Sequence, residues 1–362
     1  MGSLVPIVIP SYEPDERLID LLEELDEKNI APVVLLNDGS DSSYDEIFDR
    51  AKEIISKKGG VYLEHEVNMG KGKGLKDAFS YILTNMPEAI GCVTADSDGQ
   101  HTPDCIRAIV DKLIKCPNKL ILGVRDFDDP GVPRKSRLGN KITVKVFKFF
   151  TGLSISDTQT GLRGISRDFM KDLLKTKGDR FEYETRMLIE TKDKVGIEEV
   201  TIETVYDSKE NHTTHFNPVK DSIRIYKIFG AMFLRFMFSS LSSSVVDILL
   251  FALFCKLNAG IYPGEWDVFA SGVEARIISA TYNFLVNYVF VFKSKERKRS
   301  AVLKYVLLAI CQGLTSAGIV TGLVVLTSEA FEVVIKIIVD VTLFFLSYYI
   351  QREFVYRSRK KK

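Results

Sequence analysis

The 362-residue sequence is poor in cysteine and almost without net charge, and each scarcity excludes a class of protein. The few cysteines lack the paired spacing of a disulfide framework or a zinc site, so we expect reduced thiols that serve as small apolar residues. They are Cys92, Cys105, Cys116, Cys255 and Cys311. The formal net charge of +1 gives no whole-molecule attraction for nucleic acid, and we expect no such partner.

Long apolar runs are missing from the first part of the chain. Residues 1 to about 228 alternate apolar and charged segments, as a soluble α/β domain does, whereas long apolar runs dominate residues 229 to 356. The N-terminus has no charged region followed by a long apolar core, so we expect no signal peptide there. The length is sufficient for two domains, which we predict at 1–228 and 229–362.

Short apolar runs in the first part alternate with segments of helical periodicity. Runs typical of strands fill residues 4–9, 33–36, 61–63 and 90–93, and each precedes a polar loop and then apolar residues at helical spacing. This alternation predicts a Rossmann-like α/β fold with a mostly parallel sheet. A ligand crevice is expected at the ends of the strands, where the polar loops follow.

Two carboxylates follow the fourth predicted strand, in the stretch TADSDGQH at residues 94–101. Asp96 and Asp98 are one residue apart, so in an extended or turning segment both side chains point to one side. There they can share a divalent cation with the oxygens of a bound diphosphate. An isolated pair of this kind is also typical of a surface turn, because turns are rich in Asp and Gly.

Several motifs occur together with this pair and make the pattern specific. They are PSYEPDE (10–16), NDGS (37–40), NMGKGKG (68–74), DSDGQH (96–101), GVR (123–125), DTQTGLRG (157–164) and FEYE (181–184). The set resembles family 2 glycosyltransferases of the GT-A type, and among them the dolichyl- or polyprenyl-phosphate hexose synthases that transfer mannose or glucose. The motifs run through most of residues 1–228 in the family's order.

The resemblance implies a site for a nucleotide sugar and a divalent metal, Mg²⁺ or Mn²⁺. The implied donor-binding residues are Pro10, Tyr12, Glu13, Asp38, Lys71, Asp96 and Gln100, with Asp38 accepting a hydrogen bond from the base. The metal would be held by Asp96, Asp98 and Gln100. The glycines around Lys71 fit neither a P-loop nor a dinucleotide fingerprint. His101 is open to two interpretations, a metal ligand or a residue at a helix entry.

The resemblance also implies an acceptor site for the phosphate of a polyprenyl lipid. The residues implied for that phosphate are Arg125, Arg134, Arg137 and Arg163. Cations near a membrane can instead attract anionic lipid heads, worth about 1 kcal/mol per charge. Asp98, Asp157 and Arg125 are the predicted catalytic residues, with Asp157 positioning the acceptor or Arg163.

A phosphate monoester, whose second pKa is about 6, is largely a dianion at pH 7 and needs no general base. The resemblance implies single displacement with inversion at the anomeric carbon. Two further groups are weaker candidates. Glu182 and Glu184 either act in the site or form a solvated helix face, and His215 and Arg224 lie in or after a polar loop that in the family closes over the donor phosphates.

The C-terminal part contains four apolar segments long enough to cross a bilayer, at about 236–257, 268–292, 302–327 and 333–355. Lys and Arg are concentrated at 293–299 and 357–362 and are absent from 258–267, so the positive-inside rule predicts that the catalytic domain and the C-terminus are cytoplasmic. This part resembles GtrA-like four-helix membrane domains. Asp247 and Asp340 lie within predicted spans, where either a helix-to-helix hydrogen bond or a transport role is expected.

Together these features predict an enzyme of the cell (plasma) membrane that transfers a hexose from UDP-glucose or GDP-mannose to dolichyl or undecaprenyl phosphate. A homo-oligomer formed through the membrane domain is left open. One alternative is a processive polysaccharide synthase, although the QxxRW motif of those enzymes is absent and the single tryptophan is Trp266. Another is a transporter or scaffold for lipid-linked sugars, which the intact pair of Asp96 and Asp98 disfavours.

Overall fold

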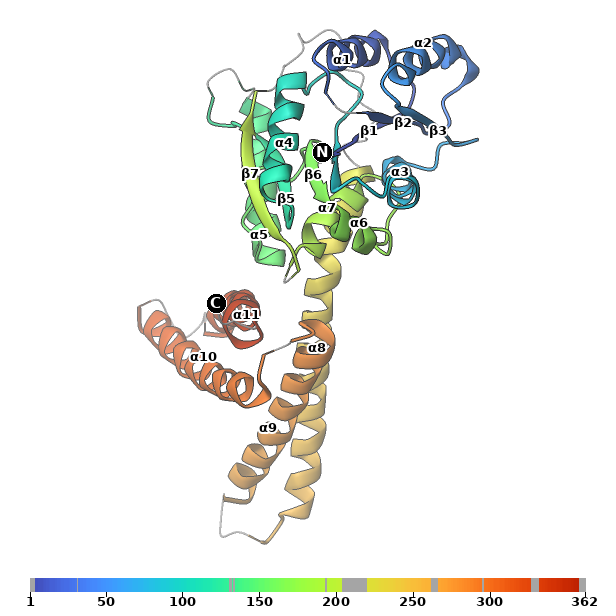
Figure 1. Ribbon diagram of the computed structural model, residues 1–362. Helices are drawn as coiled ribbons and strands as arrows, with labels where there is room; N and C mark the ends of the chain where they lie inside the picture. Colours follow the sequence, from blue (N-terminus) through green and yellow to red (C-terminus); the bar gives the residue numbers. More distant parts are fainter. Residues whose placement is uncertain are drawn as a thin grey trace. The chain divides into compact units, whose positions relative to one another are not determined.

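The computed structural model describes residues 4–30, 32–129, 132, 134–192, 194–203, 220–261, 266–294, 296–326 and 332–357. The chain divides into two compact units, Met1–Ile228 and Phe229–Lys362. Figure 1 follows the chain through both units in sequence colours.

The first unit is built on a seven-stranded sheet with the order β3-β2-β1-β4-β6-β5-β7. Its strands are β1 (Ile7–Ser11), β2 (Val33–Asn37), β3 (Val61–Glu64), β4 (Gly91–Thr94), β5 (Lys119–Arg125), β6 (Arg163–Ser166) and β7 (Gly196–Ile202). β6 runs antiparallel to β4 and β5, and the other strand pairs are parallel. The prediction of a mostly parallel α/β sheet is therefore confirmed.

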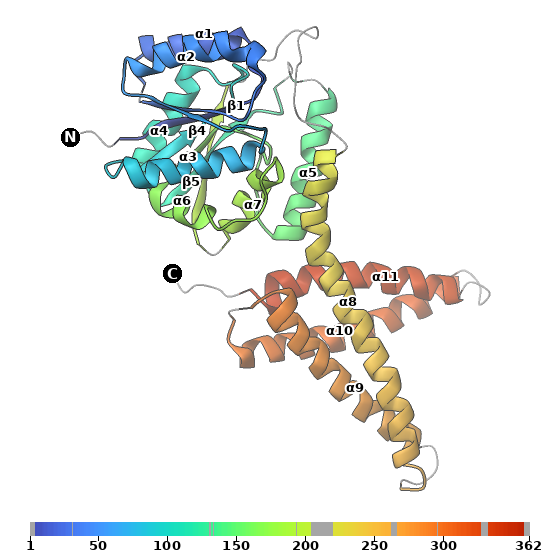
Figure 2. The same ribbon diagram turned by 90° about the vertical axis from the view of Figure 1, so that its right-hand side faces the viewer.

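Helices cover both faces of this sheet (Figure 2). Helices α1, α2 and α4 pack with one another on one face, and α3 lies with α6 and α7 on the other. The bounds are α1 (Glu16–Glu27), η1 (Ser42–Tyr44), α2 (Asp45–Ser56), α3 (Lys71–Asn85), α4 (Pro103–Lys115), α5 (Arg134–Thr151), α6 (Arg167–Leu173) and α7 (Glu182–Glu190). Because each crossover helix returns the chain to the edge where the parallel strands begin, the loops that follow these strands collect at the opposite edge.

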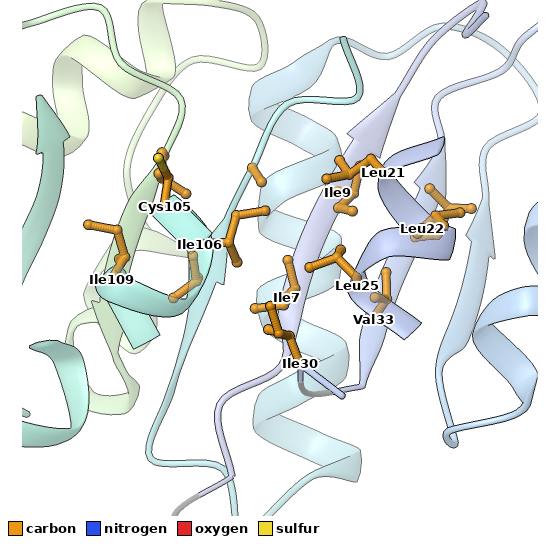
Figure 3. Close-up of a cluster of buried hydrophobic side chains, with 14 of the residues drawn as sticks. Ile7, Ile9, Leu21, Leu22, Leu25, Ile30, Val33, Cys105, Ile106 and Ile109 are labelled. Carbon is orange, nitrogen blue, oxygen red and sulfur yellow. The ribbon is translucent and has the colours of Figure 1, made fainter. Parts of the chain in front are cut away.

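The main core of the first unit lies between the sheet and the helices α1 and α4 (Figure 3). Leu21, Leu22 and Leu25 of α1 pack over Ile7 and Ile9 of β1, as the predicted helical spacing requires. All five side chains are at most 4% exposed. Full burial of such a side chain contributes about 1.5–3 kcal/mol, so this layer fixes the strands whose ends carry the polar loops.

The first strand lies later in the chain than the sequence predicted. The prediction was residues 4–9 followed by a loop, whereas β1 extends through Pro10 to Ser11. Alternation along the strand turns the backbone of Val8 towards β4 and that of Ser11 towards β2, since the Val8 carbonyl accepts from Ala95 and the Ser11 carbonyl from Asp38. Pro10 therefore faces the β4 side beyond the last β1–β4 pair, where its missing N–H costs no ladder bond.

The second unit is helical and contains α8 (Lys220–Leu257, which begins in the first unit), α9 (Trp266–Val286), η2 (Asn287–Val291), α10 (Lys298–Leu326), α11 (Glu332–Ile350) and η4 (Gln351–Val355). Among the described residues, three helices are long and apolar enough to cross a membrane: Lys227–Leu257, Lys298–Leu323 and Val334–Val355. The predicted second span is helical but is not one of these, since Glu274, Arg276 and Asn283 lower its hydropathy. Four spans stay a prediction.

The acidic residues within the predicted spans are hydrogen-bonded between helices. Asp247 of α8 accepts from the Ser279 hydroxyl of α9 at 2.6 Å, and Asp340 of α11 accepts from the Ser316 hydroxyl of α10 at 2.7 Å. Each carboxylate also has a cationic partner, which for Asp340 is Lys336 at 2.8 Å. These contacts are the helix-to-helix hydrogen bonds that the sequence left as one of two interpretations.

Candidate functional site

A cleft of about 650 Å³ opens where the loops after β1, β2 and β4 meet the segments around α7. It joins parts of the chain from residue 10 to residue 185. Its lining residues are Pro10, Ser11, Tyr12, Asp38, Asn68, Gly70, Lys71, Asp96, Ser97, Asp98, Gln100, Arg125, Thr158, Gln159, Arg163, Arg180, Phe181, Glu184 and Thr185. Carboxylates and guanidinium groups therefore share one concave surface.

Lys71 is the main cationic partner of the first aspartate of the pair. Its ammonium group lies 2.6 Å from Oδ1 of Asp96 and 3.1 Å from Oε1 of Glu184. Burial alone would lower the pKa of Lys71, but the attraction of Asp96 and Glu184 outweighs it and raises that pKa. Burial likewise favours the neutral form of Asp96, yet attraction to Lys71 and His101 lowers its pKa below the ordinary value. Asp96 is thus held as a carboxylate beside a fixed positive charge.

Asp98, two residues further along the chain, has a different environment. Its Oδ1 accepts from the backbone N–H of Gln100 at 3.1 Å, across Gly99, whose φ of +71° favours glycine. Burial raises the pKa of Asp98, and the nearby charge of Asp96 raises it further. The pair therefore presents negative charge that Lys71 compensates at Asp96 and leaves less compensated at Asp98.

Gly161 lies directly against the Asp96 carboxylate. A Cβ atom at this position would stand 2.1 Å from Oδ2 of Asp96, far inside any allowed contact. The carbonyl of Gly161 in turn accepts from the Thr94 hydroxyl at 2.7 Å. The glycine of the DTQTGLRG motif thus leaves the space that the first aspartate occupies.

Asp38 holds the glycine-rich loop at the edge of the cleft. Its carboxylate accepts from the backbone N–H groups of Met69 and Gly70 at 2.9 and 2.8 Å, and it contacts Nδ1 of His65 at 2.7 Å. Nε2 of His65 lies 2.9 Å from Asp77 on α3. The side chain that the sequence assigned to the nucleobase therefore also ties β2 to the entry of α3.

Arg125 and Asp157 form a two-pronged ion pair. Nε and Nη2 of Arg125 donate to the two oxygens of Asp157 at 2.7 and 3.0 Å, and the guanidinium lies 4.8 Å from the Phe127 ring centre. Asp157 is fully buried, whereas 22% of the Arg125 side chain is exposed. Two parallel hydrogen bonds fix the plane of a guanidinium, so Asp157 orients Arg125 in the wall of the cleft.

Arg163 has an open donor in the same cleft. Its residue is 1% exposed, and its Nε and Nη1 donate to the carbonyls of Thr160 and Glu184 at 2.9 and 2.8 Å. Its Nη2 has no hydrogen-bond partner in the part of the chain that the structure describes. Burial lowers the pKa of this guanidinium while the carboxylate of Glu184 opposes that effect. A buried cation with an unused N–H favours an anionic ligand.

Two parts of the chain match known families. Residues 7–174 match "Glycosyl transferase family 2", and residues 235–361 match "GtrA/DPMS, transmembrane domain". The chain joins a family 2 glycosyltransferase domain to a GtrA/DPMS transmembrane domain. It is accordingly a glycosyltransferase and a membrane protein, and the GT-A prediction for the first part is confirmed.

Among curated proteins, a UDP-N-acetylglucosamine–dolichyl-phosphate N-acetylglucosaminyltransferase of Methanococcus voltae is 27% identical over 225 residues, covering 56% of this chain and 86% of that protein. A dolichyl-phosphate hexose transferase of Haloferax volcanii is 26% identical over 170 residues, covering 46% and 68%. Among solved structures, the mannosyltransferase PcManGT of Pyrobaculum calidifontis, in complex with GDP-Man and Mn²⁺, superposes with a TM-score of 0.39 at 14% identity, covering 97% of this chain and 87% of that one.

Most residues that the sequence assigned to the glycosyltransferase site line the cleft. Three do not: Glu13, whose N–H donates to Ser40 Oγ at 2.8 Å, the buried Asp157, and Arg137, whose Nη2 donates to the Asp129 carbonyl at 2.6 Å. The side chains of Arg134 and Arg224 and all of His215 lie outside the described residues. Asp157 was predicted to position the acceptor or Arg163, but its described ion pair is with Arg125, and Arg163 is held by carbonyls.

The glycosyltransferase cleft also contains residues to which the sequence assigned no role. Arg180 and Phe181 come from the segment before α7, and Nη1 of Arg180 donates to Asn68 at 3.4 Å. The FEYE motif marked this segment, yet Glu184 lines the cleft whereas Glu182 accepts from the N–H of Asp179. No local pattern identifies Arg180, because its place depends on packing with a loop 112 residues earlier.

A divalent metal fits the acidic side of the cleft. Among the described residues, no group of three or more His, Cys, Asp or Glu side chains is arranged as a metal centre. Asp96, Asp98 and Gln100 nevertheless offer carboxylate and amide oxygens, the ligands that Mg²⁺ and Mn²⁺ accept, with donor phosphates as further ligands. The raised pKa of Asp98, caused by burial and the charge of Asp96, indicates negative charge that a cation would neutralise.

Proposed function

We propose that the chain transfers a hexose from a nucleotide sugar to the phosphate of a polyprenyl lipid, with inversion at the anomeric carbon. The observation that carries this proposal is the pairing of opposite charges in one cleft. Asp96 and Asp98 lie on one side, and Arg125 and Arg163 line the same space. A diphosphate donor with its cation needs the first pair, and an anionic acceptor needs the guanidinium groups.

The donor would lie along the loops after β1, β2 and β4. Asp38 and Tyr12 are then placed for the nucleoside, and Asp96, Asp98 and Gln100 would hold the metal with the diphosphate. The metal, when bound, would stabilise the charge that develops on the departing nucleotide. Lys71 stands between Asp96 and Glu184 and can add a second positive charge near the diphosphate.

The acceptor needs orientation rather than activation. A lipid phosphate monoester is already largely a dianion at pH 7, so the reaction requires no proton transfer from it. Asp157 is fully buried and engaged with Arg125, which disfavours a role as general base and supports a positioning role. Arg125 would bind the acceptor phosphate, and Arg163, whose buried Nη2 has no partner among the described residues, adds positive charge in the same cleft.

The membrane domain would keep the enzyme beside its lipid acceptor. Basic residues at 293–299 and 357–362 support a cytoplasmic position for the catalytic domain and the C-terminus, by the positive-inside rule. The two named relatives use a lipid phosphate but differ in sugar, N-acetylglucosamine in one and a hexose in the other. UDP-glucose and GDP-mannose are the donors we propose, and UDP-N-acetylglucosamine is the comparison.

Membranes containing the full chain test the proposal. They are incubated with undecaprenyl or dolichyl phosphate, Mg²⁺ or Mn²⁺ and one radiolabelled donor at a time, and label is followed into the organic phase. We expect labelling with one hexose donor that EDTA abolishes. Labelling with UDP-N-acetylglucosamine alone would correct the sugar. Donor binding without any lipid labelling would support a transporter or scaffold, and label in a polymer would support a polysaccharide synthase.

A further inference from the structure

The last turn of the second unit contains a buried cation with unused hydrogen-bond donors. Arg352 lies in η4, and its side chain is only 2% exposed. Its Nη1 and Nη2 are both buried without a hydrogen-bond partner, and no other described side chain has two such nitrogens. Guanidinium groups are costly to bury unless they are paired, so this position requires a physical explanation.

The surroundings of Arg352 are ordered and mainly aromatic. The guanidinium lies 5.8 and 5.4 Å from the ring centres of Tyr348 and Tyr349, and η4 packs against α10 and α11. The adjacent Gln351 has both ends of its amide engaged, with Ser347 at 3.0 Å and Asn287 at 3.2 Å. The open donors of Arg352 are therefore not the result of a loosely packed turn.

The charges around Arg352 leave an excess of one positive charge. Its Nε donates to Oε1 of Glu353 at 2.9 Å, and the other oxygen of Glu353 accepts from Arg357 at 2.6 Å. One carboxylate thus serves two guanidinium groups. The excess charge and the two free N–H-bearing nitrogens of Arg352 fit a single anionic group that accepts hydrogen bonds in a fork, as phosphate does.

The position of Arg352 in the chain indicates where that anion comes from. Arg352 is the fourth residue from the C-terminal end of the apolar helix Val334–Val355, and the basic segment 357–362 follows. A helix end flanked by Lys and Arg lies at the level of the lipid headgroups. We propose that Arg352 forms a binding site in the membrane domain for the phosphate group of a membrane lipid, separate from the catalytic cleft.

The test uses the full chain purified in detergent, with thermal unfolding and native mass spectrometry as the two measurements. The probes are dioleoyl phosphatidylglycerol, dioleoylglycerol, which has the same acyl chains without phosphate, and inorganic phosphate. We expect phosphatidylglycerol to raise the unfolding temperature and to remain bound, dioleoylglycerol to do neither, and inorganic phosphate to act only at a concentration at least tenfold higher. An equal effect of inorganic phosphate would overturn the assignment to a lipid.

Three variants decide whether Arg352 is the site. Arg352→Gln should lose the shift caused by phosphatidylglycerol while unfolding close to wild type without lipid, because Glu353 keeps Arg357 as its cationic partner. Arg357→Gln is the matched control, since it removes an exposed charge from the same Glu353 and should keep the shift. Arg125→Gln, in the catalytic cleft, should keep it too.

The proposal is overturned if Arg352→Gln keeps the full lipid shift, or if Arg357→Gln loses as much of it as Arg352→Gln. Should Arg352→Gln fail to fold, Arg352→Lys replaces it, since lysine retains the charge but not the fork of donors. We expect Arg352→Lys to bind phosphatidylglycerol at least fivefold more weakly, and unchanged binding would overturn the proposal.

Discussion

The two units of this glycosyltransferase differ in the kind of polar contact that predominates in them. In the first, charged groups are taken into the interior as pairs, such as the fully buried Asp157 with Arg125 and the Lys71 ammonium with Asp96. In the second, the contacts between apolar helices are mostly hydroxyl and amide hydrogen bonds, such as Ser279 with Asp247 and Asn287 with Gln351. The difference indicates that the first unit uses charge to orient its cleft, whereas the second uses weaker bonds to hold its helices in register.

Exposed apolar side chains follow the same division. Phe238, Leu303 and Leu326 of the second unit are 73%, 72% and 80% exposed, whereas strands β1, β2, β4, β5 and β6 of the first unit bury their apolar side chains. A surface of this kind is stable only against lipid or another protein. Polar contacts between the helices of the second unit should each contribute little, because helices that are separated within the membrane also find hydrogen-bond partners.

The largest effect is expected from breaking the buried ion pair. Asp157→Ala leaves Arg125 without its partner, and since 22% of that side chain is exposed, the loss of unfolding free energy should lie at the lower end of the range for such pairs, about 3 kcal/mol. Chemical denaturation, followed by a spectroscopic signal of the tertiary structure of the catalytic domain, measures this free energy of unfolding. The KM for the lipid acceptor should rise more than that for the donor.

The matched control is Asp128→Ala, which breaks the surface pair of Asp128 with Lys141. Those side chains are 83% and 55% exposed, so the change should cost less than about 1 kcal/mol. Equal destabilisation by the two variants would show that the buried pair has no special role.

The next effect is expected from Asp98, the carboxylate whose charge Lys71 compensates less than that of Asp96. Asp98→Asn keeps the shape of the side chain but removes the charge that would hold the cation, and activity should fall by about 100-fold or more. Binding of Mn²⁺, followed by electron paramagnetic resonance, should weaken in parallel. Asp104→Asn, an exposed aspartate at the start of α4, should change neither quantity. Retained Mn²⁺ affinity in Asp98→Asn would remove Asp98 from the metal site.

A smaller loss is expected when the space beside Asp96 is filled. Gly161→Ala places a Cβ atom 2.1 Å from the Asp96 carboxylate, which must then rotate away from Lys71. We expect donor affinity to fall about tenfold, or about 1.4 kcal/mol. Gly139→Ala is the control, because a Cβ there meets nothing within 4 Å and alanine favours a helix. Unchanged donor binding in Gly161→Ala would show that the position of Asp96 is not critical.

Local patterns in the sequence predicted those parts of the fold that depend on neighbouring residues. The order of the first four strands and their helices and the carboxylates after β4 follow from short stretches, and the structure shows Thr102 as the cap of α4. His101 precedes that cap and is buried 3.7 Å from Asp96, so it supports both interpretations given from the sequence. The antiparallel insertion of β6 between β4 and β5 has no such local signal.

Long-range pairing and burial could not be predicted in this way. The partner of Asp157 is Arg125, 32 residues earlier, and Arg180 lines the cleft beside Asn68, to which it donates a hydrogen bond. Arg352 lies five residues before the basic segment 357–362, yet it is buried because η4 packs against α10 and α11. These features depend on how distant segments meet, which charge and periodicity along the chain do not specify.

The smallest effect is expected from the hydrogen bonds between the helices of the second unit. Ser279→Ala removes the hydroxyl that donates to Asp247 at 2.6 Å between α8 and α9. Hydrogen bonds between membrane helices contribute about 0.6 kcal/mol on average, so the variant should lower the unfolding temperature of the membrane domain only slightly, by about 1–2 °C. Thr281→Ala is the control, since Thr281 bonds only its own helix at Ile277 in the part of the chain described. If Ser279→Ala lost as much unfolding free energy as Asp157→Ala, the polar contacts between the membrane helices would be as important to the fold of the membrane domain as the ion pairs are to the first unit.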